Sequence, residues 1–269
     1  MRAFKILLIA LLAVVSGLYG YTSLYAAGNG SKVPPVLSSD RDVLEITVDA
    51  DPSDLLAGLT ASDPQDGDLT DRIQVAGVSK LINDNTAKVT YIVFDSDQNM
   101  ATLVRQVRYT DYTKPRFYLS QPLIYYRNEH IGIVDRLGAR DVLDGDISHS
   151  VRASLLEPTS DPELFLVSCQ VTNSMGDTVY LDLPVIQFEG VAIRPEVNLR
   201  EYLVYLEAGT PFSARSYVAG VNIPEGSGSV SDVIITGRVD TNTPGVYTVR
   251  YDYPYSGVTG TAILTVVVE

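Results

Sequence analysis

The side chains of this chain that are best placed for metal chemistry are closely spaced aspartates. They occur in two loops: Asp63, Asp66, Asp68 and Asp71 in one, and Asp141, Asp144 and Asp146 in the other. Carboxylate oxygens are ligands that calcium prefers, and aspartates at alternate positions are typical of the start of a calcium-binding loop. The two loops are therefore candidate calcium sites.

A structural explanation competes with the metal site. The EF-hand pattern also requires a closing glutamate and flanking helices, and neither loop has them. Both loops contain Asp-Gly-Asp, in which aspartate side chains cap their own backbone and glycine adopts a positive φ. We favour a tight turn and keep weak calcium binding as the alternative. No other cofactor is expected.

Few other residues suggest chemistry. The only cysteine is Cys169, and the only histidines are His130 and His149. A single cysteine cannot form a disulfide within the chain, although a free thiol could pair with another molecule. The sequence has no nucleophile elbow, His-Glu-x-x-His or Cys-x-x-Cys motif. We predict no catalytic residues, surface positions for both histidines and a buried, inert Cys169.

An internal repeat positions these loops. Residues 61–73 align with residues 139–151 at an offset of 78, and residues 89–96 align with residues 167–174 at the same offset. A weaker third copy begins at residue 249, which is 160 positions after residue 89, and extends to residue 253. This copy lacks the acidic loop. The repeat gives Cys169 the position of Tyr91 and Tyr251, on the predicted inner face of a central strand.

The elements that carry the loops are predicted to be short strands. Apolar residues alternate with period two through Val89, Tyr91 and Val93, and turn residues separate such runs. Prolines 80 residues apart (35, 115 and 195) mark the starts of the repeats. We therefore predict an all-β chain of three tandem immunoglobulin-like β-sandwich domains, at residues 33–113, 114–193 and 194–269, after an N-terminal hydrophobic helix within residues 1–32.

The motifs of these domains resemble a known family. Residues 58–63, 66–70, 89–91 and 95–96 are similar to bacterial Ig-like repeats of surface and secreted proteins, related to the Ig-like modules of some pesticidal crystal proteins and to hyalin-type repeats. Residues 209–212 and 244–249 resemble them too. The resemblance covers residues 33–269 and implies spacer, stalk or adhesive modules on cell surfaces. The second domain departs from the pattern at residues 155–164.

The N-terminal segment predicts export. Arg2 and Lys5 precede residues 6–27, which carry no charge and are long enough to span a bilayer. A retained membrane anchor and a cleaved signal peptide, cut near Ala26-Ala27-Gly28, both fit this pattern. We predict N-terminal anchoring on the extracellular face of the membrane, with secretion after cleavage as the alternative.

Charge and composition narrow the partners. The formal net charge of −13 disfavours nucleic acid. Exposed tyrosines could bind protein or stack on sugar, and the candidates are Tyr125, Tyr126, Tyr202, Tyr205 and Tyr255. We predict a non-enzymatic surface protein, a spacer or interaction rod on the order of 100 Å long. Its expected partners are envelope or matrix proteins, or glycans. The alternatives are a calcium-rigidified adhesin, a glycan-binding module and, last, an accessory module of a polysaccharide-acting enzyme.

Overall fold

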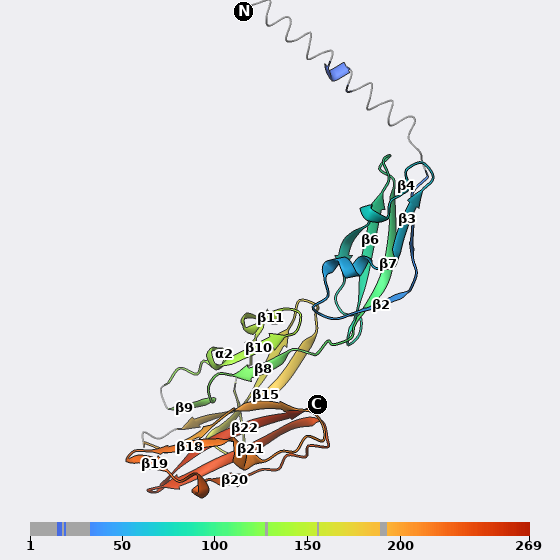
Figure 1. Ribbon diagram of the computed structural model, residues 1–269. Helices are drawn as coiled ribbons and strands as arrows, with labels where there is room; N and C mark the ends of the chain where they lie inside the picture. Colours follow the sequence, from blue (N-terminus) through green and yellow to red (C-terminus); the bar gives the residue numbers. More distant parts are fainter. Residues whose placement is uncertain (1–14, 18, 20–32, 127–128, 155, 189–192) are drawn as a thin grey trace, which may run out of the picture. The chain divides into compact units, whose positions relative to one another are not determined.

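Nearly all of the regular secondary structure in the described residues is β-strand. The computed structural model describes residues 15–17, 19, 33–126, 129–154, 156–188 and 193–269. These residues divide into two compact units, Met1–Tyr112 and Thr113–Glu269 (Figure 1). The all-β prediction is confirmed, whereas the number of tandem domains and their boundaries stay predictions. The first, second and third predicted domains are residues 33–113, 114–193 and 194–269.

Most of the predicted hydrophobic segment, residues 6–27, lies outside the described residues. Among the residues that are described, no helix combines the length and the apolar character needed to cross a bilayer. The choice between anchor and signal peptide therefore stays open.

The first predicted domain consists of two sheets. One has the strand order β1–β3–β4 and the other has the order β2–β7–β6–β5, and Figure 1 shows β2, β7 and β6 side by side. The elements are β1 (Val36–Ser39), β2 (Val43–Ile46), η1 (Pro52–Leu56), β3 (Leu59–Asp63), β4 (Gly67–Asp68), η2 (Thr70–Arg72), β5 (Gln74–Val78), β6 (Thr86–Phe94) and β7 (Met100–Tyr109).

The second predicted domain repeats this plan. Its sheets have the orders β11–β10–β8 and β12–β14–β15–β9, with β13 added beside β14. The elements are β8 (Arg116–Leu119), β9 (Ile124–Tyr126), α2 (Ile133–Arg136), β10 (Leu137–Asp141), β11 (Gly145–Asp146), η3 (Ser148–Ser150), β12 (Arg152–Ala153), β13 (Glu157–Pro158), β14 (Leu164–Thr172) and β15 (Thr178–Phe188).

The third predicted domain has the sheets β16–β18–β19 and β17–β22–β21–β20. Its elements are β16 (Glu196–Leu199), β17 (Leu203–Leu206), η4 (Ala214–Tyr217), β18 (Val218–Ile223), β19 (Gly226–Gly228), η5 (Val230–Asp232), β20 (Ile234–Thr236), β21 (Gly245–Tyr255) and β22 (Val258–Val268).

One unusual pairing recurs in all three stretches of described residues. The second strand of each, β2, β9 or β17, pairs parallel with the last strand, β7, β15 or β22, while the neighbouring pairs are antiparallel. A parallel edge strand in the same place indicates that the repeat in the sequence is a repeat of topology.

The period of two places the predicted residues in the cores. On β6, the side chains of Val89, Tyr91 and Val93 are fully buried and pack with Leu69 and Ile73 from the acidic-loop side. Each such side chain contributes roughly 1.5–3 kcal/mol through burial. The predicted equivalence also holds, because Cys169 and Tyr251 are fully buried at the matching strand positions.

The second and third predicted domains pack against each other. Leu203 on β17 joins the hydrophobic cluster of the second domain, together with the half-buried Tyr205. The hydroxyl of Tyr205 accepts a hydrogen bond from the backbone N–H of Phe117 at 2.9 Å. The sequence predicts only a short, proline-bearing junction here, and the structure adds a shared apolar contact because β17 lies against β8.

Candidate functional sites

The first acidic loop is a turn closed by its own aspartate. Asp63 ends β3, and its Oδ1 accepts hydrogen bonds from the backbone N–H groups of Gln65 and Asp66, at 2.8 and 3.0 Å. Gly67 follows with a φ of 76°, a conformation that glycine adopts without strain. The residue types therefore specify the turn directly.

The second acidic loop repeats this geometry. Oδ1 of Asp141 accepts from the backbone N–H groups of Leu143 and Asp144, at 2.9 and 3.0 Å, and Gly145 has a φ of 73°. Two loops 78 residues apart thus use the same hydrogen bonds, as the turn interpretation expects.

The middle aspartates connect each loop to a neighbouring hairpin. The carboxylate of Asp66 accepts from the backbone N–H and the hydroxyl of Ser96, at 2.5 and 2.8 Å. Asp144 does the same with Ser174, at 2.6 and 2.7 Å. The backbone N–H of Ser96 is the main cause of the lowered pKa of Asp66. These carboxylates bridge two segments of the fold.

The last aspartates of the loops cap short helical turns. Asp68 accepts from the backbone N–H of Thr70 at 2.9 Å, and Asp146 accepts from the N–H and hydroxyl of Ser148 at 2.9 and 2.6 Å. Hydrogen bonds from these residues, the hydroxyl first, lower the pKa of both carboxyls. Asp71 lies exposed in η2.

The loops do not gather many acidic groups at one point. Within the described residues, no group of three or more His, Cys, Asp or Glu side chains is arranged to hold a metal ion. Calcium binding by the seven aspartates stays a prediction, and the hydrogen bonds of Asp63, Asp66, Asp68, Asp141, Asp144 and Asp146 supply a structural role.

One buried carboxylate of the first loop departs from the pattern. Asp63 is 6% exposed, and its Oδ2 has no hydrogen-bond partner in the described structure. In the second domain, the corresponding Oδ2 of Asp141 accepts from Nδ2 of Asn173 at 3.1 Å. The repeat offset of 78 assigns Asp95, also 6% exposed, to the position of Asn173. Sequence reasoning did not single out Asp95, although the repeat alignment contained it.

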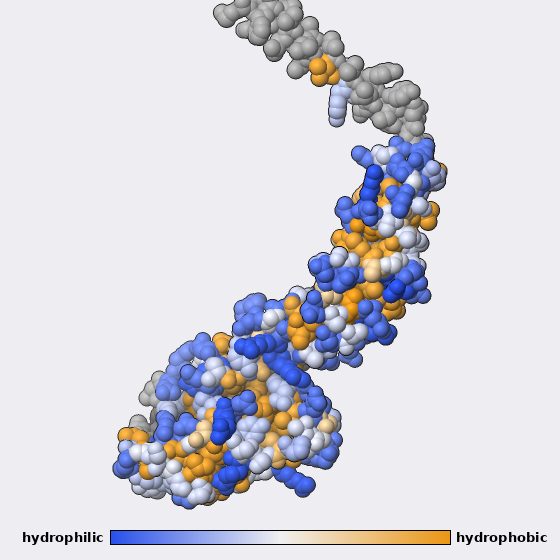
Figure 2. All heavy atoms as spheres, viewed as in Figure 1, coloured by the Kyte–Doolittle hydropathy of each residue, from blue (hydrophilic) through white to orange (hydrophobic). Residues whose placement is uncertain are grey.

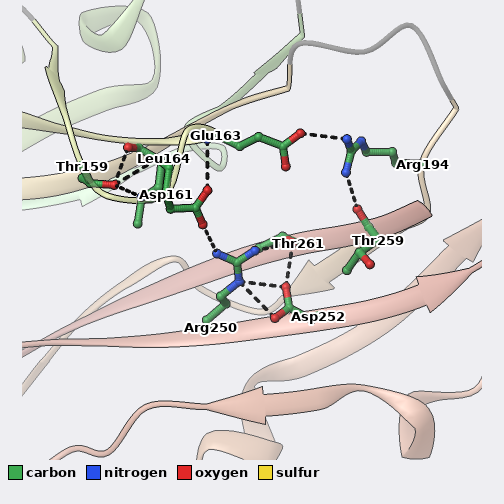
Figure 3. Close-up of polar contacts among 9 residues, drawn as sticks. All are labelled: Thr159, Asp161, Glu163, Leu164, Arg194, Arg250, Asp252, Thr259 and Thr261. Carbon is green, nitrogen blue, oxygen red and sulfur yellow. Dashed lines mark hydrogen bonds and ion pairs between the residues drawn. The ribbon is translucent and has the colours of Figure 1, made fainter. Parts of the chain in front are cut away.

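A second candidate site lies between the second and third predicted domains. Figure 3 shows Arg250 of β21 directed at the loop that contains Asp161. Its guanidinium donates to Oδ2 of Asp161 at 2.8 Å and to Asp252 at 2.9 Å. Arg194 donates to Oε1 of Glu163 at 2.8 Å and to the carbonyl of Thr259 at 3.0 Å.

This network was missed by sequence reasoning, and one signal for it existed. The segment 155–164 is where the second domain departs from the family pattern, and that segment supplies both carboxylates, Asp161 and Glu163, to the network. A loop whose sequence departs from the corresponding segments of the other repeats is a reason to look for a contact outside its own domain.

A pocket of about 230 Å³ opens at the same junction. Its lining includes the aromatic rings of Tyr126, Phe188 and Tyr202, and polar groups of Glu196, Asn198 and Thr261. The rings of Tyr126 and Phe188 lie 5.5 Å apart at a tilt of 46°. Apolar walls with a few convergent polar groups are typical of ligand pockets.

The remaining candidates take structural positions. Cys169 is fully buried, and burial raises the pKa of its thiol to about 12, which removes the reactive thiolate at neutral pH. His130 and His149 are exposed, as predicted. The placement of Tyr125 among exposed tyrosines is wrong, because its ring is buried in the second core and its hydroxyl donates to the carbonyl of Gly132.

The other tyrosine candidates divide by location. Tyr126 and Tyr202 line the junction pocket, Tyr205 packs at the junction itself, and Tyr255 donates to the carboxylate of Glu225. Two of the five candidates, Tyr126 and Tyr202, therefore share one pocket.

The third predicted domain carries a family signature. Residues 201–268 match the family model described as "Bacterial surface protein, Ig-like domain". This match confirms the predicted resemblance to bacterial Ig-like surface domains. It falls in the repeat that lacks the acidic loop. No curated protein matches the chain.

Solved structures give weak likenesses. The CBM51-2 domain in complex with GlcNAc and INT domains of Clostridium perfringens ZmpB is 16% identical, with a TM-score of 0.24, and the match covers 55% of this chain and 26% of that one. Drosophila N-cadherin EC1-4 is 13% identical, with a TM-score of 0.24, over 88% of this chain and 75% of that one. A lipoprotein of Bacteroides thetaiotaomicron is 12% identical, with a TM-score of 0.22, and the match covers 86% of this chain and 98% of that one.

Likenesses at these TM-scores support no statement about function. The chain spans 26% and 31% of two ZmpB chains that it matches, less than two thirds of their length. The resemblance to bacterial Ig-like surface domains therefore rests on the family match to residues 201–268.

Proposed function

We propose that this chain is a non-catalytic surface protein, tethered through residues 6–27, in which three Ig-like domains present an interaction surface outside the cell. The observation that carries the proposal is the match of residues 201–268 to bacterial surface Ig-like domains. The hydrogen bonds of the acidic loops support it, since Asp63 and Asp141 are used to build turns. The uncharged segment 6–27 supports the tether.

A feature of the first domain supports the interaction role. On the outer face of its β2–β7–β6–β5 sheet, Phe94 on β6 pairs with Met100 on β7, and they are 43% and 52% exposed. Val104, further along β7, is 58% exposed. Figure 2 shows hydrophobic side chains at the visible surface of this unit. A solvated sheet face normally carries polar residues, and exposed apolar groups that gather mark contact sites. The proposed partner is an envelope or matrix protein.

The location is tested by protease treatment of intact cells. The full-length chain should fractionate with membranes and be digested by externally added protease, whereas a cytoplasmic protein in the same cells should be spared. Full protection of the chain in intact cells, with digestion only after lysis, would contradict the proposal.

The interaction surface is tested by crosslinking on cells. A variant with Phe94→Ser, Met100→Ser and Val104→Thr should lose the crosslinked partner bands of the native chain. Val246→Thr is the matched control, since Val246 is 51% exposed but lies on β21 of the third domain. If the triple variant retains every crosslink, this surface is not the contact site.

A glycan-binding function is the second candidate, and the junction pocket favours it. The rings of Tyr126 and Tyr202 offer flat apolar faces, and Asn198 and Glu196 offer hydrogen-bonding groups for sugar hydroxyls. Calorimetric titration with neutral oligosaccharides should then show binding that Tyr126→Ala and Asn198→Ala weaken at least tenfold. Tyr180→Ala, an exposed tyrosine on β15 outside the pocket lining, serves as control. No heat of binding from the native chain would exclude this function for the sugars tested.

A further inference from the structure

The repeated acidic loops differ at one buried position. In the second domain, the amide of Asn173 donates to the carboxylate of Asp141, and both side chains are buried, at 5% and 6% exposure. In the first domain, the same repeat positions hold Asp95 and Asp63, each 6% exposed. An amide–carboxylate pair has become a pair of carboxylates.

The surrounding geometry is otherwise conserved between the two loops. Oδ1 of Asp63 accepts the same two backbone N–H bonds as Oδ1 of Asp141. Asp66 holds its loop against Ser96 as Asp144 holds its loop against Ser174. Oδ1 of Asp95 accepts from the backbone N–H of Asn99 at 2.7 Å, as Oδ1 of Asn173 accepts from the backbone N–H of Asp177 at 2.9 Å. From this match we infer that the second oxygen of Asp95 has the position that the Asn173 amide nitrogen has in the second domain.

This replacement leaves the first loop without a donor. Oδ2 of Asp63 is buried and has no hydrogen-bond partner among the described residues. The Asp95 carboxylate accepts from the backbone N–H and the side-chain amide of Asn99, both at 2.7 Å. No Lys or Arg of the described chain forms an ion pair with Asp63 or Asp95. Two buried carboxylates without a compensating charge are unfavourable.

We propose that Asp63 and Asp95 bind Ca²⁺, and that this site exists in the first domain and not in the second. Both side chains accept N–H hydrogen bonds, and a hard cation in place of the missing amide would compensate the two carboxylates. Calcium accepts six to eight oxygens, including backbone carbonyls and water. Two carboxylates make a weak site, comparable to extracellular modules that bind with Kd values of about 10⁻⁴–10⁻³ M.

The proposal is tested by hydrogen exchange of the full-length chain, measured by mass spectrometry with CaCl₂ or with EGTA. At a calcium concentration about ten times Kd, opening of the loop at residues 63–68 and of the turn at residues 95–99 should become about tenfold rarer. The equivalent segments of the second domain, residues 141–146 and 173–177, should not respond. Both domains are measured in the same sample, so each serves as reference for the other.

Two reciprocal substitutions make the test specific. Asp95→Asn installs the amide found in the second domain, and it should abolish the calcium response while the first domain remains as protected in EGTA as the native domain. Asn173→Asp installs the carboxylate pair in the second domain, and calcium should now slow exchange at residues 141–146.

Each contrary outcome overturns the proposal. If calcium leaves exchange of the native first domain unchanged, the two carboxylates are compensated in another way, such as a shared proton. If the response survives in Asp95→Asn, calcium binds elsewhere on the chain.

Discussion

A buried guanidinium organises the core of the first domain. Arg105 on β7 is 2% exposed and donates to the backbone carbonyls of Ala57 and Leu55, at 2.7 and 2.6 Å, and to the hydroxyl of Tyr91 at 3.1 Å. Its charge also lies 5.2 Å from the centre of the Tyr91 ring. The planar fork of arginine suits several acceptors at once, so this side chain fixes the η1 segment to the sheet.

We predict that Arg105→Met lowers the free energy of unfolding of the first domain by about 2–4 kcal/mol, because it removes charge-assisted hydrogen bonds and leaves the Ala57 carbonyl unpaired. Hydrogen exchange of residues 86–109 measures the loss. Arg108→Met, on the same strand, is the matched control: its ion pair with Glu45 is exposed, at 47% and 59%, and contributes little. Equal losses in both variants would refute the role of Arg105.

One thiol and two phenol groups of the second unit predict sensitivity to alkali. Burial raises the pKa of Cys169, Tyr205 and Tyr251 to about 12 each. Above the ordinary pKa values the unfolded chain loses these protons first, so it binds fewer protons than the folded chain. The free energy of unfolding should therefore fall from about pH 9 for the thiol and from about pH 10 for the two phenols, up to about pH 12, with a slope of at most about 1.4 kcal/mol per pH unit for each group.

Urea unfolding at a series of pH values checks this prediction. Cys169→Val removes the thiol and should give a shallower fall just above pH 9. The thiol of the native chain should also resist iodoacetamide at pH 8 and react once urea is added. Rapid labelling of the folded chain would show that Cys169 is accessible after all.

At the scale of elements, the loop of the second domain that contains Asp161 and Glu163 is shaped for its contact with the third. Oδ1 of Asp161 accepts a hydrogen bond from the backbone N–H of Glu163 at 3.0 Å. The hydroxyl of Thr159 donates to the backbone carbonyl of Leu164 at 2.8 Å and closes the same turn. This leaves Oδ2 of Asp161 directed at Arg250 (Figure 3). The backbone N–H of Glu163 is the main cause of the lowered pKa of Asp161.

We predict that Arg250→Met speeds hydrogen exchange at residues 159–165 and lowers the free energy of unfolding by about 1 kcal/mol. The effect is modest because Arg250 and Asp161 are each 36% exposed. The contribution of Asp161 is present at neutral pH and is lost as the pH falls below about 4, since its folded-state pKa is lowered. Arg152→Met, an exposed arginine on β12, is the control, and an equal effect there would argue against the network.

At the scale of the whole molecule, the two compact units differ in the number of sheets that they contain. The first unit holds one pair of described sheets, whereas the second unit holds two pairs. Leu203 explains part of the difference, because it belongs to the β17 strand of the third domain but packs in the core cluster of the second. The second and third domains are therefore expected to resist unfolding together.

We predict that Leu203→Ala lowers protection in both the second and third domains, with a loss of about 2–5 kcal/mol. Leu44→Ala is the matched core deletion, since Leu44 lies on β2, is 4% exposed and packs in the first cluster. Its effect should stay within the first unit. Hydrogen exchange resolves the domains, and a Leu203→Ala effect confined to the third domain would disprove the coupling.

The sequence by itself determined the local structure of this protein. Period-two alternation and the offset of 78 placed Tyr91, Cys169 and Tyr251 in equivalent buried positions, because the face on which a strand residue lies follows from its neighbours. The Asp-Gly-Asp turns were predictable for the same reason, since aspartate and glycine act on the backbone within three residues.

Only the tertiary structure decided which polar groups are buried and what satisfies them. In the sequence, Arg105 looks like an ordinary polar residue of a strand. The backbone carbonyls that accept its hydrogen bonds, those of Leu55 and Ala57, lie about 50 residues away in sequence. The partner of Asp161 is 89 residues distant. The proposed calcium site at Asp63 and Asp95 likewise requires two segments to meet. A pattern along the chain records polarity and period, whereas compensation of a buried charge depends on contacts between distant segments.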